Sequence, residues 1–327
     1  MKISISIEPH VGYSYEDIVT LAKAAEEAGF YRFTVSDHFF GWIEGRENQC
    51  YEAWTTLALL TPQTEKIRLG TQVTCQSYRN PALLAKIAAN LDNASNGRIT
   101  LDIGAGWKKP EYDAYGYSYP STKTRILQLR EALQILNLLW TEERPSFDGE
   151  FYSIKETMFL PKPVQKPRIP LWVGSETLRA PMMEETAARY ADGVDYIKST
   201  AADYAQKKKR MRVMCKKVGR NFEELGWSTG LMVAVIGEDT DDFENRKRDV
   251  IRQKWHLGVY TEEFKKKALE AGCKQDLAGP PERVVERLRQ YKEHVDVFNI
   301  GLPFVGNVRQ MGLDTIRILK DHIVPKL

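Results

Sequence analysis

Residues 31–38 read YRFTVSDH, an apolar run that ends abruptly in an acid and an imidazole. The amphipathic segment before this run predicts a helix, so the run itself predicts a strand that leaves a β-α-β unit. α/β barrels build their reaction centres from side chains at the carboxyl ends of parallel strands. Imidazole has an unperturbed pKa close to neutrality and can donate or accept a proton. We therefore expect a reaction centre at Asp37 and His38; a capping aspartate beside a structural histidine is the alternative.

The rest of the chain repeats this alternation of strands and helices. Strand-like runs are predicted at residues 3–7, 33–35, 67–74, 97–103, 171–173, 192–196, 230–235 and 297–300. Amphipathic stretches predict helices, the clearest of which are residues 14–28, 52–60, 122–140 and 307–322. Eight strands that alternate with helices, without a linker-like stretch, predict a single α/β domain over residues 1–327, a (β/α)8 TIM barrel. An Asp-Gly turn signal in residues 147–152 predicts a small hairpin insertion.

Composition and charge exclude several classes of protein. The 47 basic and 44 acidic residues nearly cancel, and no basic stripe stands out, so binding of nucleic acid is not expected. The four cysteines lie far apart, which argues against a disulfide framework or a structural zinc site and fits a reducing cytoplasm. The N-terminus lacks the apolar stretch of a signal peptide, and no run approaches the roughly 20 apolar residues that span a bilayer. We expect a cytoplasmic protein without a metal site or a membrane partner.

Two glycine-containing segments that follow predicted strands are candidate binding loops. Gly104-Ala105-Gly106-Trp107 comes directly after the fourth strand. Its glycines let the backbone approach a ligand, and its N–H groups can meet an anion at the next helix start. The third glycine of a dinucleotide-binding fingerprint is missing, so a tight turn is the alternative. Gly174 and Ser175 follow the fifth strand in the same way, and Ser175 is either a helix cap or a phosphate ligand.

Glu8 and Trp107 are further candidates at the same predicted barrel mouth. Glu8 follows the first strand, where a carboxylate between apolar walls can have a raised pKa and donate a proton. A salt-bridged glutamate is the alternative. Trp107 is either a flat wall for a planar ring or a core residue.

Several motifs occur in a fixed order along nearly the whole chain. They are residues 24–30 (AAEEAGF) leading to Ser36-Asp37-His38, residues 67–71 (IRLGT), residues 96–98 (NGR), residues 104–107 (GAGW) with Glu111, residues 191–193 (ADG) and residues 278–284 (AGPPERV). Together they resemble the luciferase-like monooxygenase superfamily, in particular its coenzyme F420-dependent oxidoreductases.

The resemblance implies how the predicted mouth is used. A deazaflavin or flavin ring would lie at the carboxyl ends of the strands, supported by a non-prolyl cis peptide on the third strand at Gln72–Val73. The cofactor phosphate would meet Gly174 and Ser175. The residues implied to line the cofactor site are Asp37, His38, Gln72, Val73, Gly106, Trp107, Glu111, Gly174 and Ser175.

The implied activity is transfer of a hydride between C5 of the deazaflavin and a small organic substrate. His38 would be the general acid or base, and Glu8 a second candidate for proton delivery. Two alternatives stay open: an FMN-dependent monooxygenase, and a non-catalytic paralogue that binds flavin or F420. Sugar-phosphate dehydrogenases of this branch carry a catalytic glutamate where this chain has Trp107, so glucose-6-phosphate is not the expected substrate. Relatives are commonly dimers, which implies a homodimer, and substrate-recognising groups are expected in residues 39–51, 108–120 and 250–275.

Overall fold

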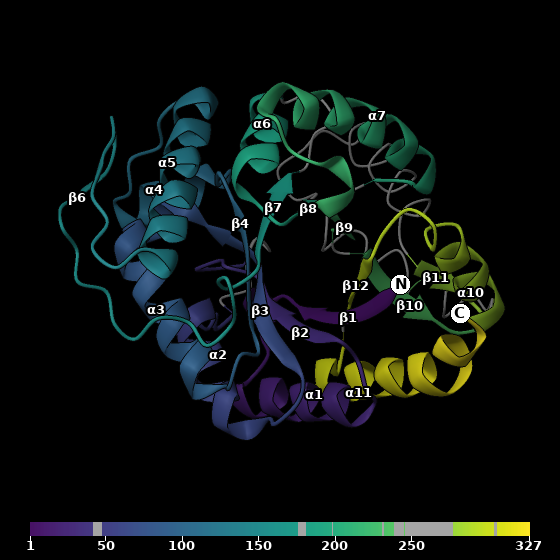
Figure 1. Ribbon diagram of the computed structural model, residues 1–327. Coiled ribbons are helices and arrows are strands. Elements are labelled where there is room, and N and C mark those ends of the chain that lie inside the picture. The colour runs from purple at the N-terminus through teal and green to yellow at the C-terminus, as the bar shows by residue number, and fades with distance from the viewer. Residues whose placement is uncertain are drawn as a thin grey trace.

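The computed structural model describes residues 1–41, 48–175, 181–197, 199–230, 232–238, 245, 277–303 and 306–327. Within these ranges, eight strand positions form one closed parallel barrel with helices around it (Figure 1). The predicted fold class is therefore confirmed. Of the predicted substrate loops, residues 42–47 and all of 250–275 lie outside the described residues.

The strands follow one another around the barrel in sequence order. Each pairs in parallel with its neighbour, and the last strand closes the barrel by pairing with the first, where Lys2 lies opposite Val297. The barrel strands are β1 (Lys2–Ile7), β2 (Arg32–Val35), β3 (Arg68–Cys75), β4 (Ile99–Gly104), β7 (Leu171–Ser175), β8 (Gly193–Tyr196), β9 (Gly226–Thr229), β10 (Met232–Ile236) and β12 (Val297–Gly301).

The seventh barrel position consists of two strand pieces, which corrects the prediction. Both β9 and β10 pair with β12, so this position begins at Gly226 and not at residue 230. The hydropathy pattern hides the first piece because two of its three buried residues, Ser228 and Thr229, are polar. Ser228 and Thr229 are fully buried and hydrogen-bond to Asn299 of β12. A further strand outside the prediction, β11 (Leu277–Gly279), pairs with β10.

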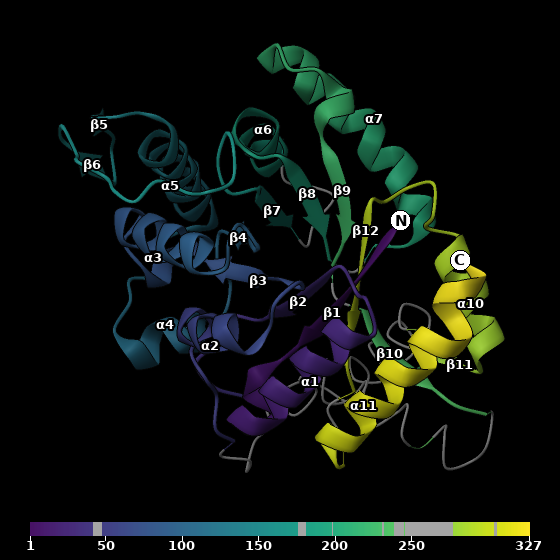
Figure 2. The ribbon, with the colours of Figure 1, turned by 60° about the horizontal axis from the view of Figure 1, so that its bottom comes forward.

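The helices surround the barrel, as the two ribbon views show (Figures 1 and 2). The first one starts with a capping box between Ser14 and Asp17 and ends just before Gly29, whose φ of 76° is left-handed. In the described ranges no helix has both the length and the apolar character needed to cross a membrane. The helices are α1 (Tyr15–Glu27), α2 (Ala53–Leu60), α3 (Pro81–Ala94), α4 (Lys109–Tyr115), α5 (Thr122–Thr141), α6 (Pro181–Tyr190), α7 (Ala201–Val218), α10 (Pro281–Arg289) and α11 (Val308–Ile318), with short turns η1 (Pro9–Val11), η2 (Thr61–Gln63), η3 (Gln76–Tyr78), η4 (Phe222–Glu224), η6 (Leu319–Ile323) and η7 (Val324–Lys326).

The predicted hairpin is confirmed and lies outside the barrel beside α5 (Figure 2). Its strands β5 (Phe147–Asp148) and β6 (Ser153–Ile154) pair antiparallel. Glu131 of α5 accepts hydrogen bonds from the backbone N–H groups of Glu150, Phe151 and Tyr152. The hairpin is thus fixed to the outer helix layer and does not disturb the barrel.

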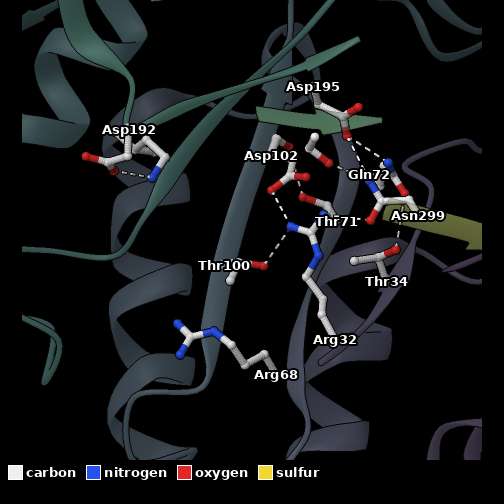
Figure 3. Close-up of polar contacts among 12 residues, drawn as sticks. Arg32, Thr34, Arg68, Thr71, Gln72, Thr100, Asp102, Asp192, Asp195 and Asn299 are labelled. Carbon is white, nitrogen blue, oxygen red and sulfur yellow. Dashed lines mark hydrogen bonds and ion pairs between the residues drawn. The ribbon is translucent and has the colours of Figure 1, made fainter. Parts of the chain in front are cut away.

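The interior of the barrel contains a layer of polar side chains (Figure 3). Arg32 of β2 donates to the Asp102 carboxylate of β4 at 2.8 Å and to the Asn299 amide oxygen at 3.0 Å. Gln72 of β3 donates to the Asp195 carboxylate of β8 at 2.7 Å. All five residues are less than a tenth exposed. Buried polar groups must be paired, so this layer fixes the relative positions of five barrel strands.

Candidate active site

The carboxyl ends of the parallel strands bring most of the predicted site residues to one mouth of the barrel. Glu8 follows β1, His38 follows β2, and Trp107 follows β4, while Gly174 and Ser175 end β7. The imidazole of His38 contacts residues from two other parts of the mouth, Trp107 after β4 and Glu111 of α4. Its ring centroid is 6.1 Å from that of Trp107, and the two rings meet edge to face.

His38 is held by a buried carboxylate that comes from α4, 73 residues further along the chain. The Nδ1 atom of His38 lies 3.0 Å from Oε2 of Glu111, a side chain with no exposed surface. Glu111 also accepts from the Tyr78 hydroxyl at 2.7 Å and from the Lys108 ammonium at 2.9 Å. Burial pulls the pKa of Glu111 upward, but the hydrogen bond and charge of His38, with help from Lys108 and Tyr78, lower it to about 2.

The ionised Glu111 determines which nitrogen of His38 carries the proton. A carboxylate can only accept a hydrogen bond, so the Nδ1 atom of His38 must be the donor. In the neutral imidazole the Nε2 atom is then a base, and in the imidazolium the positive charge faces Glu111. This pair can therefore exchange a proton at Nε2 while its orientation stays fixed.

The third strand carries the predicted irregularity. The peptide bond Gln72–Val73 is cis, and the pairing of β3 with β4 shifts register between Thr71 and Thr74. The first observation confirms the predicted cis bond. Gln72 points into the barrel, where its amide donates to Asp195 and its carbonyl accepts from the Ser6 hydroxyl at 2.8 Å (Figure 3).

Val73 lies on the mouth side of this irregularity, packed against two glycines. A Cβ atom on Gly174 would come within 2.6 Å of the Val73 Cγ1 atom, and one on Gly104 within 3.2 Å of Cγ2. The half-buried Val73 side chain thus crosses the ends of β4 and β7 only because neither strand carries a side chain there. The result is an apolar surface at the barrel mouth.

Gly106 occupies a position that only glycine can fill. Its φ is +77°, and a Cβ atom would come within 2.0 Å of the Tyr112 hydroxyl oxygen. The following residue, Trp107, is 55% exposed. Glycine therefore lets the loop turn tightly over α4 and present the indole ring at the surface.

The comparison with protein families decides the classification. A family model described as luciferase-like monooxygenase matches residues 1–296. The chain belongs to the luciferase-like monooxygenase family.

Curated relatives of this luciferase-like chain include F420-dependent dehydrogenases. The F420-dependent glucose-6-phosphate dehydrogenase of Amycolatopsis mediterranei is 31% identical over 179 residues, which cover 54% of this chain and 52% of that protein. This chain therefore matches about half the length of that relative. The enzyme of the same name from Kribbella flavida is 28% identical over 290 residues, or 85% of each chain.

A solved structure of a protein described as an F420-dependent secondary alcohol dehydrogenase, in complex with an F420–acetone adduct, has the same fold. Its TM-score with this chain is 0.82, over 100% of this chain and 99% of that chain, at 21% identity. At this level of identity the likeness shows the luciferase-like barrel fold alone.

Asp37 differs from the other predicted site residues of the luciferase-like chain in its surroundings. Its two carboxylate oxygens accept a bidentate pair of hydrogen bonds from Arg79 at 2.7 and 2.9 Å, and one also accepts from the Cys75 N–H at 3.0 Å. Arg79 in turn pairs with Glu52 at the start of α2. These contacts tie the end of β2 to the end of β3. A contact between Asp37 and a cofactor stays a prediction.

Three residues of the site were not predicted individually: His10, Tyr78 and Lys108, of which Lys108 lies within the predicted range 108–120. Lys108 is buried and paired to Glu111, and burial lowers its pKa. His10 lies two residues after Glu8, and its Nδ1 atom is 3.3 Å from Oε2 of that glutamate. The signal available for His10 is the one that identified His38, a histidine just beyond the end of a strand.

Glu8 and Ser175 lie where the sequence places them, at the ends of their strands. The carboxylate of Glu8 is paired with His10, and its side chain is 19% exposed. Ser175 is half-buried, and residues 176–180 after it lie outside the described residues. Among the residues that the structure describes, no group of three or more His, Cys, Asp and Glu side chains could hold a metal ion.

Proposed function

We propose that this chain is a coenzyme F420-dependent oxidoreductase that transfers a hydride between C5 of the deazaflavin and a small organic substrate. The observation that carries the proposal is the His38–Glu111 pair, an oriented proton-transfer group at the end of β2. The names of the curated relatives supply the cofactor, since both are F420-dependent dehydrogenases. A hydroxyl and a carbonyl group differ by a hydride and a proton, so the enzyme needs both the cofactor and an acid–base residue.

The described mouth fits a planar ring. Val73 offers an apolar surface that Gly104 and Gly174 leave uncovered, and the exposed indole of Trp107 stands beside His38. We assign Val73, Gly106 and Trp107 to the ring and Gly174 with Ser175 to the cofactor phosphate. Gln72 supports Val73 from inside the barrel through Asp195.

Bound F420 supplies the two-electron hydride chemistry, and the residues of this chain supply orientation and proton transfer. For oxidation of an alcohol, the Nε2 atom of neutral His38 accepts the hydroxyl proton while the O–H bond breaks. Glu111 stabilises the resulting imidazolium because its carboxylate stays ionised. In the reverse direction, the imidazolium gives this proton to the carbonyl oxygen.

Two finer properties are part of the proposal. We propose a cytoplasmic location, supported by the free thiols of Cys50, Cys75 and Cys215. We also propose a homodimer, supported by Leu59 of α2 and Leu83 of α3, which are 46% and 55% exposed. Light scattering of the purified protein tests the dimer, and a monomer at micromolar concentration would contradict it.

The cofactor is tested by equilibrium titration of the purified protein with F420 and, separately, with FMN. We expect F420 to bind and FMN to bind at least about 10-fold more weakly, a difference of about 1.4 kcal/mol. Binding of FMN with no binding of F420 would overturn the proposal in favour of a flavin monooxygenase.

The role of His38 is tested with His38→Ala. We expect F420 affinity to stay within a few-fold and turnover to fall roughly 100-fold or more, as for loss of a general acid–base group. His322→Ala, at an exposed position near the C-terminus, is the matched control and should leave both values unchanged. Wild-type turnover in His38→Ala would remove His38 from the mechanism.

A further inference from the structure

Two imidazoles stand side by side at the barrel mouth. Ile7, the last residue of β1, lies opposite Val35, the last residue of β2, and a histidine follows each of them three residues later, His10 in η1 and His38 after β2. The two ring centroids are 5.1 Å apart, and the rings meet edge to face at 88°. Parallel pairing of two adjacent strands therefore places one histidine against the other.

Each imidazole has its own carboxylate on the Nδ1 atom. His10 pairs with Glu8 at 3.3 Å, and His38 pairs with Glu111 at 3.0 Å. His10 is 6% exposed and lies under the loop that follows His38. A Cβ atom on Gly41 of that loop would come within 2.9 Å of the His10 carbonyl oxygen, so the two segments are in close contact.

This geometry couples the protonation of the two rings. Two positive charges about 5 Å apart in a partly buried site repel one another, so protonation of one ring lowers the pKa of the other by about one unit. Glu8 favours a positive charge on His10, just as Glu111 favours one on His38. The two carboxylates thus compete for the proton through the adjacent rings.

We propose that His10, paired with Glu8, is a positioning residue whose contact with His38 disfavours a positive charge on both rings at once. The proposal rests on the function of His38 proposed above. The described charged groups around the pair are Glu8 from the end of β1, Lys108 and Glu111 from the start of α4, and the Asp37–Arg79 ion pair between the ends of β2 and β3.

The coupling is measured by NMR titration of the imidazole C–H resonances in the protein without cofactor. The chain has five histidines, so each signal is assigned by its loss in a single variant. We expect His10→Phe, which keeps a ring at this position, to raise the pKa of His38 by about one unit. His38→Phe must raise the pKa of His10 by the same amount, since coupling between two sites is reciprocal.

Two further variants keep the test decisive. His10→Gln covers the case in which a phenyl ring is not tolerated, and it should shift the pKa of His38 in the same direction. His322→Gln, at an exposed position near the C-terminus, should leave it unchanged. A His38 pKa that stays constant or falls in the folded His10 variants would overturn the proposal.

The catalytic readout is separate from the NMR readout. With F420 and an alcohol substrate, the pH profile of kcat/KM in His10→Phe should move to higher pH by the shift seen for His38, with F420 affinity unchanged. If F420 does not bind, the proposed function fails while the titration still tests the coupling. If F420 binds and is reduced but the His38 pKa does not move, only the role of His10 fails.

Discussion

A carboxylate buried beneath a histidine must have partners for both of its oxygens, and Glu111 accepts hydrogen bonds from five donors. These are the His38 imidazole, the Tyr78 hydroxyl, the Lys108 ammonium and the backbone N–H groups of Phe39 and Phe40. Through them Glu111 fixes the ring of His38 and the start of the loop that follows it. At the scale of a single residue, the same contacts of Glu111 therefore orient His38 and stabilise its positive charge.

Glu111→Gln separates these two effects. The amide keeps the size and an acceptor oxygen but not the charge, so the imidazolium of His38 loses the negative charge that stabilises it. We expect turnover in both directions to drop roughly 10- to 100-fold, as expected for a weakened acid–base residue, measured as kcat with F420 saturating.

Stability provides the control for this variant. Glu111→Gln removes the carboxylate that is paired with the buried Lys108 at 2.9 Å, which costs about 3 kcal/mol. Adding Lys108→Met should restore most of the thermal stability while activity stays low. If the double variant regained activity together with stability, the role of Glu111 would be structural only.

At the scale of elements, the mouth is shaped where β3, β4 and β7 end together. The irregular pairing in β3 turns Val73 across the ends of its neighbours, which accept it only because Gly104 and Gly174 have no side chain. Valine is branched at Cβ and has little freedom to rotate away from a new contact. The surface at the mouth is therefore sensitive to a single methyl group.

Gly174→Ala tests this arrangement. The new methyl would stand 2.6 Å from the Val73 Cγ1 atom, so Val73 must move outward into the space assigned to the ring. We expect a destabilisation of about 1–3 kcal/mol, typical of overpacking, together with about 10-fold weaker binding of F420. Thermal unfolding and fluorescence titration measure the two. The second substitution Val73→Ala should relieve the clash, and an unchanged affinity in Gly174→Ala would contradict the assignment of this surface.

The elements also show which parts of the site can be predicted from sequence. Strand ends can be predicted because hydrophobic periodicity stops there, and this located Glu8, His38 and Gly174. The cis bond at Gln72–Val73 came from the family resemblance, since no local pattern encodes it. Strand β9 was not predicted because only one of its buried residues, Trp227, is hydrophobic, and Ser228 and Thr229 are polar.

Contacts between distant side chains could not be predicted from the sequence, for a different physical reason. Periodicity indicates which face of an element is buried but not which distant side chain lies against it. That Glu111 lines the cofactor site stays a prediction, and the structure adds its contact with His38, 73 residues away in sequence, which no periodicity indicated. Asp37 was assigned to the same site, and the structure shows its carboxylate bonded to Arg79.

At the scale of the whole molecule, the barrel interior holds two carboxylates close to one guanidinium (Figure 3). Arg32 forms an ion pair with Asp102, whereas Asp195 accepts hydrogen bonds from the side-chain amides of Gln72 and Asn299. Burial, reinforced by the charge of Asp102, raises the pKa of Asp195 to about 8. The folded barrel therefore retains a proton on Asp195 that the unfolded chain releases near pH 4.

This difference makes the stability of the barrel depend on pH with a definite sign. Between about pH 4 and pH 8 the folded state binds more protons at Asp195 than the unfolded state, so stability falls as pH rises through this window. We expect the thermal midpoint of the wild type to fall between pH 6 and pH 9. Asp195→Asn keeps an acceptor for Gln72 but cannot ionise, so its thermal midpoint should vary less with pH and exceed that of the wild type at pH 9.

The matched control is Asp192→Asn, which removes a 45% exposed carboxylate bound to Arg168 and should keep the wild-type dependence of the thermal midpoint on pH. An Asp195→Asn protein that loses as much stability as the wild type over this range would show that Asp195 is already ionised in the folded barrel, and that Arg32 neutralises both carboxylates.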